Sequence, residues 1–368
     1  MNPLHAARRL ALALVPQGQG ASLARGLLIG AVAGAFCAWL KTPLPWLIGP
    51  LVACAVASAS GVRLHSLPVL RATGQWAIGT ALGLYFTPAV LARVAQLWPA
   101  LMAGVVWALA VGLSCAWALR RFAGADPATA FFAGAVGGAS EMALQGERNG
   151  GSVETIAAAH SLRIMLVVIV LPFTYRWLDL HGPETWRPGL HAADALRLAG
   201  LVLATCAGAL LLRATRSPNV WVIGPLLAAG LLTALGLGPS ALPAWAVNGG
   251  QVFIGVALGT RFRPGFFSRA PRLMTVVALS TLAAIVASAL FAGVLGHVAG
   301  IPVATMVLAT SPGGIAEMSL TAKVLGLGVP IVTVFHVTRM VVLVLVAGSL
   351  YRALAARLGW PAAEARRR

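Results

Sequence analysis

The chain has 368 residues, of which 59% are hydrophobic and only 10% are charged, and its mean hydropathy is +0.87. Soluble domains are roughly half apolar and about a quarter charged, so this composition excludes an ordinary soluble domain and places the chain in a lipid bilayer. A net charge of +18 would suggest a nucleic-acid partner in a soluble protein. Here the arginines mostly separate apolar segments, as cytoplasmic loops do, and we expect no nucleic-acid partner.

The N-terminal stretch has basic residues followed by an apolar run that is too short for a signal peptide. We therefore expect 1–24 to be a cytoplasmic tail. The rest of the sequence predicts a first membrane repeat at 25–178, a hydrophilic linker at 179–195, a second membrane repeat at 196–354 and a basic C-terminal tail at 355–368.

Each repeat contains six apolar segments, whose lengths approach the roughly 20 residues that a helix needs to cross about 30 Å of hydrocarbon. The alternation of a porin strand is absent, so helices are predicted. In the first repeat the segments lie at 26–40, 42–61, 72–87, 97–122, 127–146 and 153–175. In the second they lie at 196–214, 220–237, 247–262, 273–300, 303–325 and 329–351. The predicted fold class is an all-α polytopic membrane protein.

The two repeats share uncommon residues at a nearly constant spacing. PLPWLIGPLV at 43–52 returns as PNVWVIGPLL at 218–227, and QWAIGTALG returns 176 residues later as QVFIGVALG. The offset of 176 also relates GGASEM at 137–142 to GGIAEM at 313–318. Biased composition can repeat Leu and Ala by chance, but not Trp, Gln and Glu at one offset. We therefore infer an internal duplication.

The distribution of arginine favours inverted repeats. If all six segments of each repeat crossed, the repeats would be parallel and the basic residues would divide more evenly between the two faces. If the fifth segment is instead broken or re-entrant, each repeat has five spanning helices, and most arginines gather on the side of the N-terminus. Equivalent loops also differ, because 85–96 holds one arginine and 261–272 holds four. Inverted repeats with both termini in the cytoplasm are predicted.

Each repeat places a glutamate three residues after a glycine pair, inside an apolar segment. These residues are Gly137, Gly138 and Glu141 in the first repeat and Gly313, Gly314 and Glu317 in the second. Glycine breaks in inverted repeats are typical of transporter sites near the membrane midplane. Because an ionised carboxylate in hydrocarbon costs several kcal/mol, we predict proton or sodium sites coupled to substrate binding. The alternatives are glycines that serve close packing and glutamates that pair with a buried arginine.

The sixth segment of each repeat carries a histidine and an arginine three residues apart. They are His160 and Arg163 in the first repeat, and His336 and Arg339 in the second. Each pair shares one helix face, which we expect to look inward. An arginine there binds an anionic group of a solute or pairs with the nearby glutamate, and a histidine can titrate near neutrality.

Two glutamines are further candidates for the same cavity. Gln75 and Gln251 are related by the offset of 176, although hydrogen bonds between helices explain them equally well. The four cysteines stand singly in apolar segments without metal-ligand spacing, so we expect inert thiols, no metal and no cofactor.

These motifs, together with the duplication, resemble the AbrB-type membrane protein family, whose members have been labelled regulators of aidB expression or ammonia monooxygenases. The resemblance extends from about Arg25 to Leu354, and its most specific parts are WLIGP, the two glycine–glutamate motifs and the two HxxR helices. It implies a multi-pass protein of the bacterial inner membrane, similar in fold to inverted-repeat secondary transporters. Fold-level similarity does not by itself define an activity.

The residues favour a secondary transporter that moves a small solute, with an anion as the first candidate, by alternating access. Its partners are then the lipid bilayer, the solute and a coupling ion, and the oligomeric state is left open, homo-oligomers included. A membrane regulatory protein that affects gene expression indirectly is the alternative. We expect no enzymatic activity; a monooxygenase is less favoured because each HxxR helix offers one histidine as a metal ligand.

Single cysteines at Val90 and Phe266 test the inversion of the repeats. Membrane-impermeant reagents are expected to label the two positions from opposite sides of the membrane. Labelling of both from the same side would rule out inverted repeats.

Overall fold

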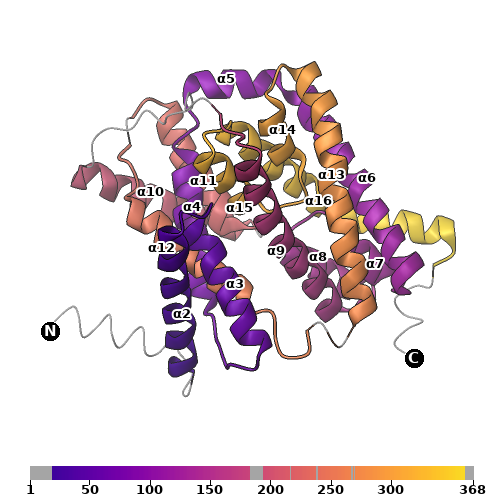
Figure 1. Ribbon diagram of the computed structural model, residues 1–368. Helices are drawn as coiled ribbons and strands as arrows, with labels where there is room; N and C mark the ends of the chain where they lie inside the picture. The colour runs from indigo at the N-terminus through magenta and orange to yellow at the C-terminus, as the bar shows by residue number, and fades with distance from the viewer. Residues whose placement is uncertain are drawn as a thin grey trace. The chain divides into compact units, whose positions relative to one another are not determined.

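The structure is a computed structural model that describes residues 19–182, 194–215, 217–237, 239–266, 268 and 270–360. These residues form helices (Figure 1). The chain divides into two compact units. Unit 1 comprises Met1–Gln75 and Ala244–Phe266, and unit 2 comprises Trp76–Pro243 and Phe267–Arg368. Each unit contains residues of both sequence repeats, so the compact units do not coincide with the repeats.

The helices occur in the same order in both repeats. Those of the first repeat are α2 Gly20–Trp39, α3 Pro45–Ala59, α4 Pro68–Gly83, α5 Pro88–Gln96, α6 Trp98–Ala123, α7 Pro127–Gly134, α8 Ala139–Arg148 and α9 Val153–Trp177. Those of the second are α10 Ala195–Ala214, α11 Val220–Ala234, α12 Ala244–Gly259, α13 Pro271–Ala299, α14 Val303–Thr310, α15 Ile315–Val324 and α16 Val329–Leu358. Most starts recur 175 or 176 residues later, as the duplication predicts.

The all-α membrane fold predicted from the sequence is confirmed. Within the described residues six helices are long and apolar enough to cross a membrane, namely α2, α6, α9, α10, α13 and α16. Helices α3, α11 and α12 are apolar but shorter. One face of α13 exposes Val286, Leu290 and Val294, as expected of a surface that meets lipid. The chain is therefore a multi-pass membrane protein.

Some helix ends differ from the predicted boundaries. Helix α2 begins at Gly20, inside the stretch predicted as a tail, and α16 continues to Leu358, beyond the predicted end of the second repeat. The remaining tail residues, 1–18 and 361–368, lie outside the described residues, as do 183–193 of the predicted linker.

Helix α5 occupies a stretch that the sequence analysis treated as a loop. Thr87 caps its N-terminus by accepting a hydrogen bond from the Val90 N–H at 3.4 Å, and Pro88 follows at the first helical position, which proline favours. The helix bends away from α4 by 90°. Val90 is buried, so it is a poor labelling site, and the exposed Ala92 and Ser268, also 176 residues apart, serve better.

In unit 1, α3 packs against both α2 and α12 through glycines. A methyl group at Gly49 would lie 2.6 Å from the Ala33 carbonyl oxygen of α2. One at Gly255 of α12 would lie 2.7 Å from the carbonyl oxygen of Leu47. Membrane helices use such small residues to bring their backbones together.

In unit 2, the C-terminal part of α4 packs against α11 in the equivalent way. A methyl group at Gly79 would overlap the Val222 carbonyl group, and one at Gly83 would lie 2.5 Å from the carbonyl oxygen of Leu226. The third helix of each repeat therefore packs on the second helix of the other repeat.

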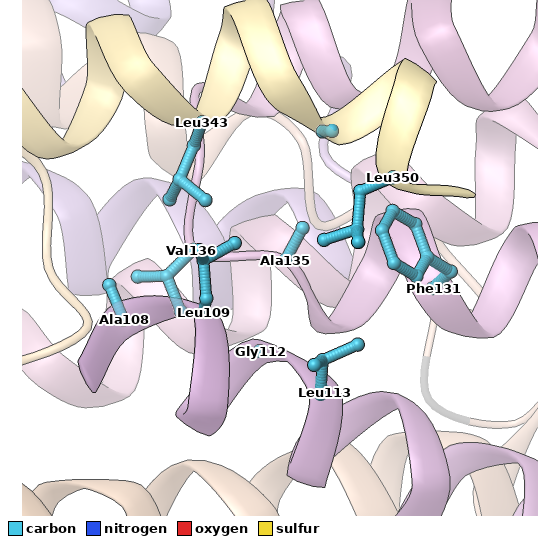
Figure 2. A pocket seen from close by; sticks show the side chains of 10 residues that line it. Ala108, Leu109, Gly112, Leu113, Phe131, Ala135, Val136, Leu343 and Leu350 are labelled. Carbon is cyan, nitrogen blue, oxygen red and sulfur yellow. The ribbon is translucent and has the colours of Figure 1, made fainter. Parts of the chain in front are cut away.

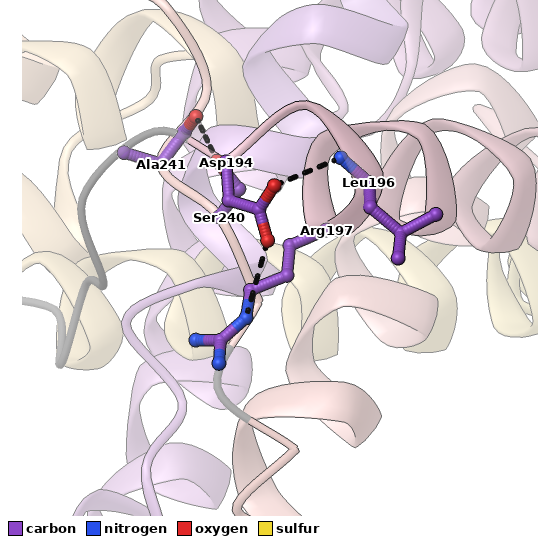
Figure 3. A network of polar contacts seen from close by, with 5 residues as sticks. All are labelled: Asp194, Leu196, Arg197, Ser240 and Ala241. Atoms are coloured by element: carbon purple, nitrogen blue, oxygen red, sulfur yellow. Dashed lines mark hydrogen bonds and ion pairs between the residues drawn. The ribbon is translucent and has the colours of Figure 1, made fainter.

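Helix α10, which packs against α11, begins at a capped N-terminus. Asp194 Oδ1 accepts a hydrogen bond from the Leu196 N–H at 3.1 Å, and Oδ2 lies 3.7 Å from Nε of Arg197 (Figure 3). In the same view the Ser240 hydroxyl donates to the Ala241 carbonyl at 3.2 Å. An aspartate cap typically stabilises a helix by about 1 kcal/mol. Helix α10 therefore has a well-defined start at the end of the predicted linker.

Equivalent helices α6 and α13 pack together in unit 2 and run antiparallel (Figure 1). Trp107 of α6 donates to the Ser288 hydroxyl at 3.1 Å and stacks on Phe291. Farther along α6, Cys115 shares a buried cluster with Ala284, which lies earlier in α13. Inverted repeats require this antiparallel order, whereas parallel repeats would align the two helices. The antiparallel order agrees with inverted repeats, while the inversion across the membrane, the number of crossings and the cytoplasmic side stay predictions.

The glycine contacts predict that Gly79→Ala destabilises the protein, by about 1–3 kcal/mol, because the backbone of α11 cannot easily move aside. Gly293→Ala is the matched control, since a methyl group there meets nothing within 4 Å. Alanine favours a helix over glycine by about 1 kcal/mol, so the control should be neutral or stabilising. Thermal unfolding in detergent measures both, and equal stability of the two variants would contradict the close approach of α4 and α11.

Candidate functional site

The fifth segment of each repeat is a hairpin of two half-helices. In the first repeat α7 and α8 are separated by residues 135–138, and in the second α14 and α15 are separated by 311–314. The ends of each segment meet: the Ser152 N–H donates to Thr129 Oγ1 at 2.8 Å, and the Gly328 N–H donates to Thr305 Oγ1 at 3.2 Å. A single broken helix would hold its two ends apart. Because the two ends of each segment are joined by a hydrogen bond, each segment begins and ends on the same side. The sequence had left this choice open.

Both predicted glutamates lie in the first turn of the second half-helix of their hairpin. The helices α8 and α15 begin at the N-cap glycines Gly138 and Gly314, which have no side chain to cap them. In each hairpin the glutamate folds back, so that a methyl group on the glycine would overlap its Oε2. The carboxylate thus lies beside the unpaired N–H groups and the positive dipole end of its helix, which favour a negative charge.

The HxxR residues bind the other side of each break. Arg163 donates to the carbonyls of Ala133, Gly134 and Ala135 at 3.3, 3.1 and 2.9 Å. In the second repeat Arg339 donates to the Ser311 carbonyl at 2.7 Å and to the Gly313 carbonyl.

The histidines form hydrogen bonds with carbonyl groups one turn earlier in the first half-helix, at equivalent positions of the two hairpins. His160 Nε2 lies 2.9 Å from the Phe132 carbonyl oxygen, and His336 Nε2 lies 2.9 Å from that of Leu308. A carbonyl oxygen only accepts, so Nε2 carries the proton in both rings.

Each break therefore has a cation at the carbonyl end of its first half-helix and an anion at the N–H end of its second. This order matches the dipoles of both half-helices. Arg163 and Arg339 donate to backbone carbonyls, and Arg163 also donates to His160. The alternative prediction, in which the arginine and glutamate form a buried ion pair, stays a prediction.

The two half-sites differ in how completely they are paired. In the first, Nη2 of Arg163 lies 2.7 Å from Nδ1 of His160, which accepts the hydrogen bond because Nε2 holds the ring proton. In the second, His336 Nδ1 and Arg339 Nε are buried and meet no hydrogen-bond partner within the described residues. A buried donor and a buried acceptor without partners are costly, so these two atoms stand out among the described polar groups.

The second hairpin and the helix that follows it, α16, also carry hydroxyl groups where the first repeat carries apolar side chains or glycine. The offset of 176 places Thr310, Ser311, Ser319 and Thr333 opposite Gly134, Ala135, Ala143 and Ala157. All four hydroxyl residues are buried, and Thr333 Oγ1 lies 2.9 Å from Ser319 Oγ. The sequence analysis did not single out Ser319 or Thr333, although aligning the repeats position by position would have exposed this polar difference.

The glutamines belong to unit 1, whereas the other predicted site residues belong to unit 2. Each follows a glycine at the place where α4 and α12 approach, since a methyl group at Gly74 would lie 2.5 Å from the Gly250 carbonyl oxygen. Gln251 is buried, with Nε2 at 3.5 Å from Asn248 Oδ1, and Gln75 is partly buried. Both glutamines therefore stand at a helix crossing.

A small apolar cavity lies on the other side of the first break, among α6, α7 and α16 (Figure 2). Leu343 of α16 points toward Val136 of the break, and Leu109 and Leu113 of α6 close the opposite side. The cavity measures about 10 Å³, which is at most the space of one water molecule. A cavity of this size is too small for a solute larger than water.

The sequence matches the AbrB family, described as "Transition state regulatory protein AbrB", over residues 9–355. The chain belongs to the AbrB family. Among its AbrB-like relatives, an "Uncharacterized protein YhjN" of Bacillus subtilis (strain 168) is 26% identical over 89% of this chain and 92% of the relative. A "Putative regulator AbrB" of Escherichia coli (strain K12) is 26% identical over 76% of this chain and 81% of the relative.

A monooxygenase label within the AbrB family would require a metal or another cofactor. The described residues contain no group of three or more His, Cys, Asp or Glu side chains that could hold a metal ion. His160 and His336 each direct Nε2 at a carbonyl oxygen instead. The residues described do not fit a metal centre.

The capping role of the arginine predicts that Arg339→Gln destabilises this AbrB protein by about 2–5 kcal/mol, because the Ser311 and Gly313 carbonyls lose their donors inside the protein. Arg352→Gln, an exposed change in the same helix, is the matched control and should have little effect. Thermal unfolding of the purified proteins measures both. Similar curves for the two variants would show that the carbonyls do not depend on Arg339.

Proposed function

We propose that this protein is a secondary transporter that moves a small solute, with an anion as the first candidate, by alternating access coupled to protons or sodium ions. The observation that carries the proposal is the pair of glutamates, each at the start of a half-helix, on hairpins of two related repeats. Carboxylates inside membranes occur mainly on ion and proton pathways. Half-helix ends near the midplane form the binding sites of inverted-repeat transporters.

Uptake of a proton or a sodium ion would change the charge at the start of α8 or α15. An ionised Glu317 is attracted by the dipole of α15, and this attraction is lost when the carboxyl group becomes neutral. Side chains arranged around the ionised carboxylate then stabilise the neutral carboxyl group less well. Ion binding can in this way shift the balance between two arrangements of a hairpin, which is the coupling that a carrier needs.

The difference between the half-sites supports an assignment of roles. Glu317 is 8% exposed, whereas Glu141 is partly exposed. We assign solute binding to the more polar second hairpin, where Arg339 Nε offers a donor and His336 Nδ1 an acceptor. In a carrier made of two related halves, alternating access moves one half against the other around the site. The proposed location is the bacterial inner membrane, with both termini in the cytoplasm.

The names printed for the family and for the Escherichia coli relative favour a second candidate, a membrane protein that regulates gene expression. A transporter can also alter expression indirectly, by changing the concentration of a metabolite. Flux through vesicles that contain only the purified protein separates the two candidates, because a regulator that acts through a partner moves no solute.

The transport test uses vesicles loaded with a pH-sensitive dye and challenged with a panel of small carboxylates and phosphate esters, under proton or sodium gradients. Glu317→Gln and Glu141→Gln are each expected to lower coupled flux at least about tenfold, since the amide can neither ionise nor take up a proton. Glu147→Gln, an exposed change in α8, is the matched control and should transport normally.

Gly314→Ala adds a second variant that keeps the carboxylate but displaces it. The added methyl group overlaps Glu317 Oε2, and a flexible side chain can turn away, so the protein should stay folded while coupled flux falls. The transporter proposal fails if no solute of the panel moves under either gradient, or if both glutamate variants transport as well as Glu147→Gln.

A further inference from the structure

A groove of about 530 Å³ opens at one end of unit 2. Its walls are the last turns of α6 and α16 and the beginning of α7. Two of its lining residues, Arg120 and Arg121, occupy the last turn of α6, and none of the described residues that line it is acidic. This charge suits an anionic ligand, and the groove takes no part in the transport mechanism proposed above.

No described residue accepts a hydrogen bond from either of the two arginines. Both are exposed, and neither forms a hydrogen bond or an ion pair with another described residue. The Arg120 guanidinium lies over the ring of Trp360 at 4.6 Å, a cation–π contact that orients it without using its N–H groups. An oriented guanidinium with free donors can bind two oxygens of a phosphate group at once.

The wall beside the arginines is apolar and open to the surroundings. Leu113 and Trp117 follow each other one turn apart on α6, and they are 40% and 62% exposed. Leu358 of α16 adds a further exposed apolar side chain to the groove. A free phosphate ion would gain nothing from these side chains, whereas a lipid would lay its acyl chains along them.

The position along the helices agrees with this ligand. Helix α6 is one of the long apolar helices, and its two arginines come at its C-terminal end next to tryptophans. Arginine and tryptophan are enriched where membrane helices reach the head-group region, and basic pockets between such helices bind anionic lipid head groups. We propose that this groove is a binding site for an anionic phospholipid, with the phosphate on Arg120 and Arg121 and the acyl chains against Leu113 and Trp117.

The test is native mass spectrometry of the protein taken from nanodiscs that contain equal amounts of phosphatidylglycerol and phosphatidylcholine with identical acyl chains. The wild type should retain phosphatidylglycerol in preference to phosphatidylcholine. The double variant Arg120→Gln/Arg121→Gln should lower this preference at least about tenfold. The matched control Arg352→Gln/Arg357→Gln removes two exposed charges from the end of α16 that do not line the groove, and it should keep the preference.

Two further measurements test the lipid site. Arg120→Lys/Arg121→Lys retains the charge and should keep most of the preference, even if the glutamine variant proves unstable. Inorganic phosphate at millimolar concentration should not displace the retained lipid, because it cannot contact the apolar wall. Equal loss in the control double variant, equal retention of the two lipids by the wild type, or displacement by phosphate alone would each overturn the lipid site.

Discussion

A helix that stops inside a membrane leaves carbonyl and N–H groups without partners, and each costs several kcal/mol in hydrocarbon unless another group pairs with it. The protein meets this constraint twice. A guanidinium and an imidazole from the next long helix bind the carbonyls where the first half-helix ends. A carboxylate lies at the start of the second half-helix. This requirement accounts for the glutamates of both hairpins and for the histidine and arginine on the helix that follows each of them.

The pairing of polar groups differs between the two repeats. Arg163 donates both to its hairpin and to His160, so the hydrogen-bonding groups of this pair are matched. Around Arg339, by contrast, the Nε donor and the Nδ1 acceptor of His336 meet no partner within the described residues. The second repeat also carries buried hydroxyl groups where the first has apolar side chains or glycine. The two repeats therefore share one framework and differ in its polar groups.

Much of this architecture could be predicted from the sequence, because apolar length and a repeated offset are local signals. Helices α7, α8, α14 and α15 begin and end beside the glycine pairs, as the motif suggested. Helix α5 was missed because its nine residues were treated as the loop between two apolar segments, although their apolar side chains recur at helical spacing. The destination of the arginine hydrogen bonds was not predictable, since a buried cation pairs equally well with a carboxylate or with carbonyl oxygens, and only the fold decides between them. Whether the segment forms a hairpin was likewise not predictable, because it depends on the hydrogen bonds that Thr129 and Thr305 accept.

The third helix of each repeat lies against the second helix of the other repeat. Glycines of α4 meet the backbone of α11, and those of α12 meet the backbone of α3. A larger side chain at one of these glycines would therefore displace the backbone of the other repeat. The two repeats are for this reason constrained to change together at these positions.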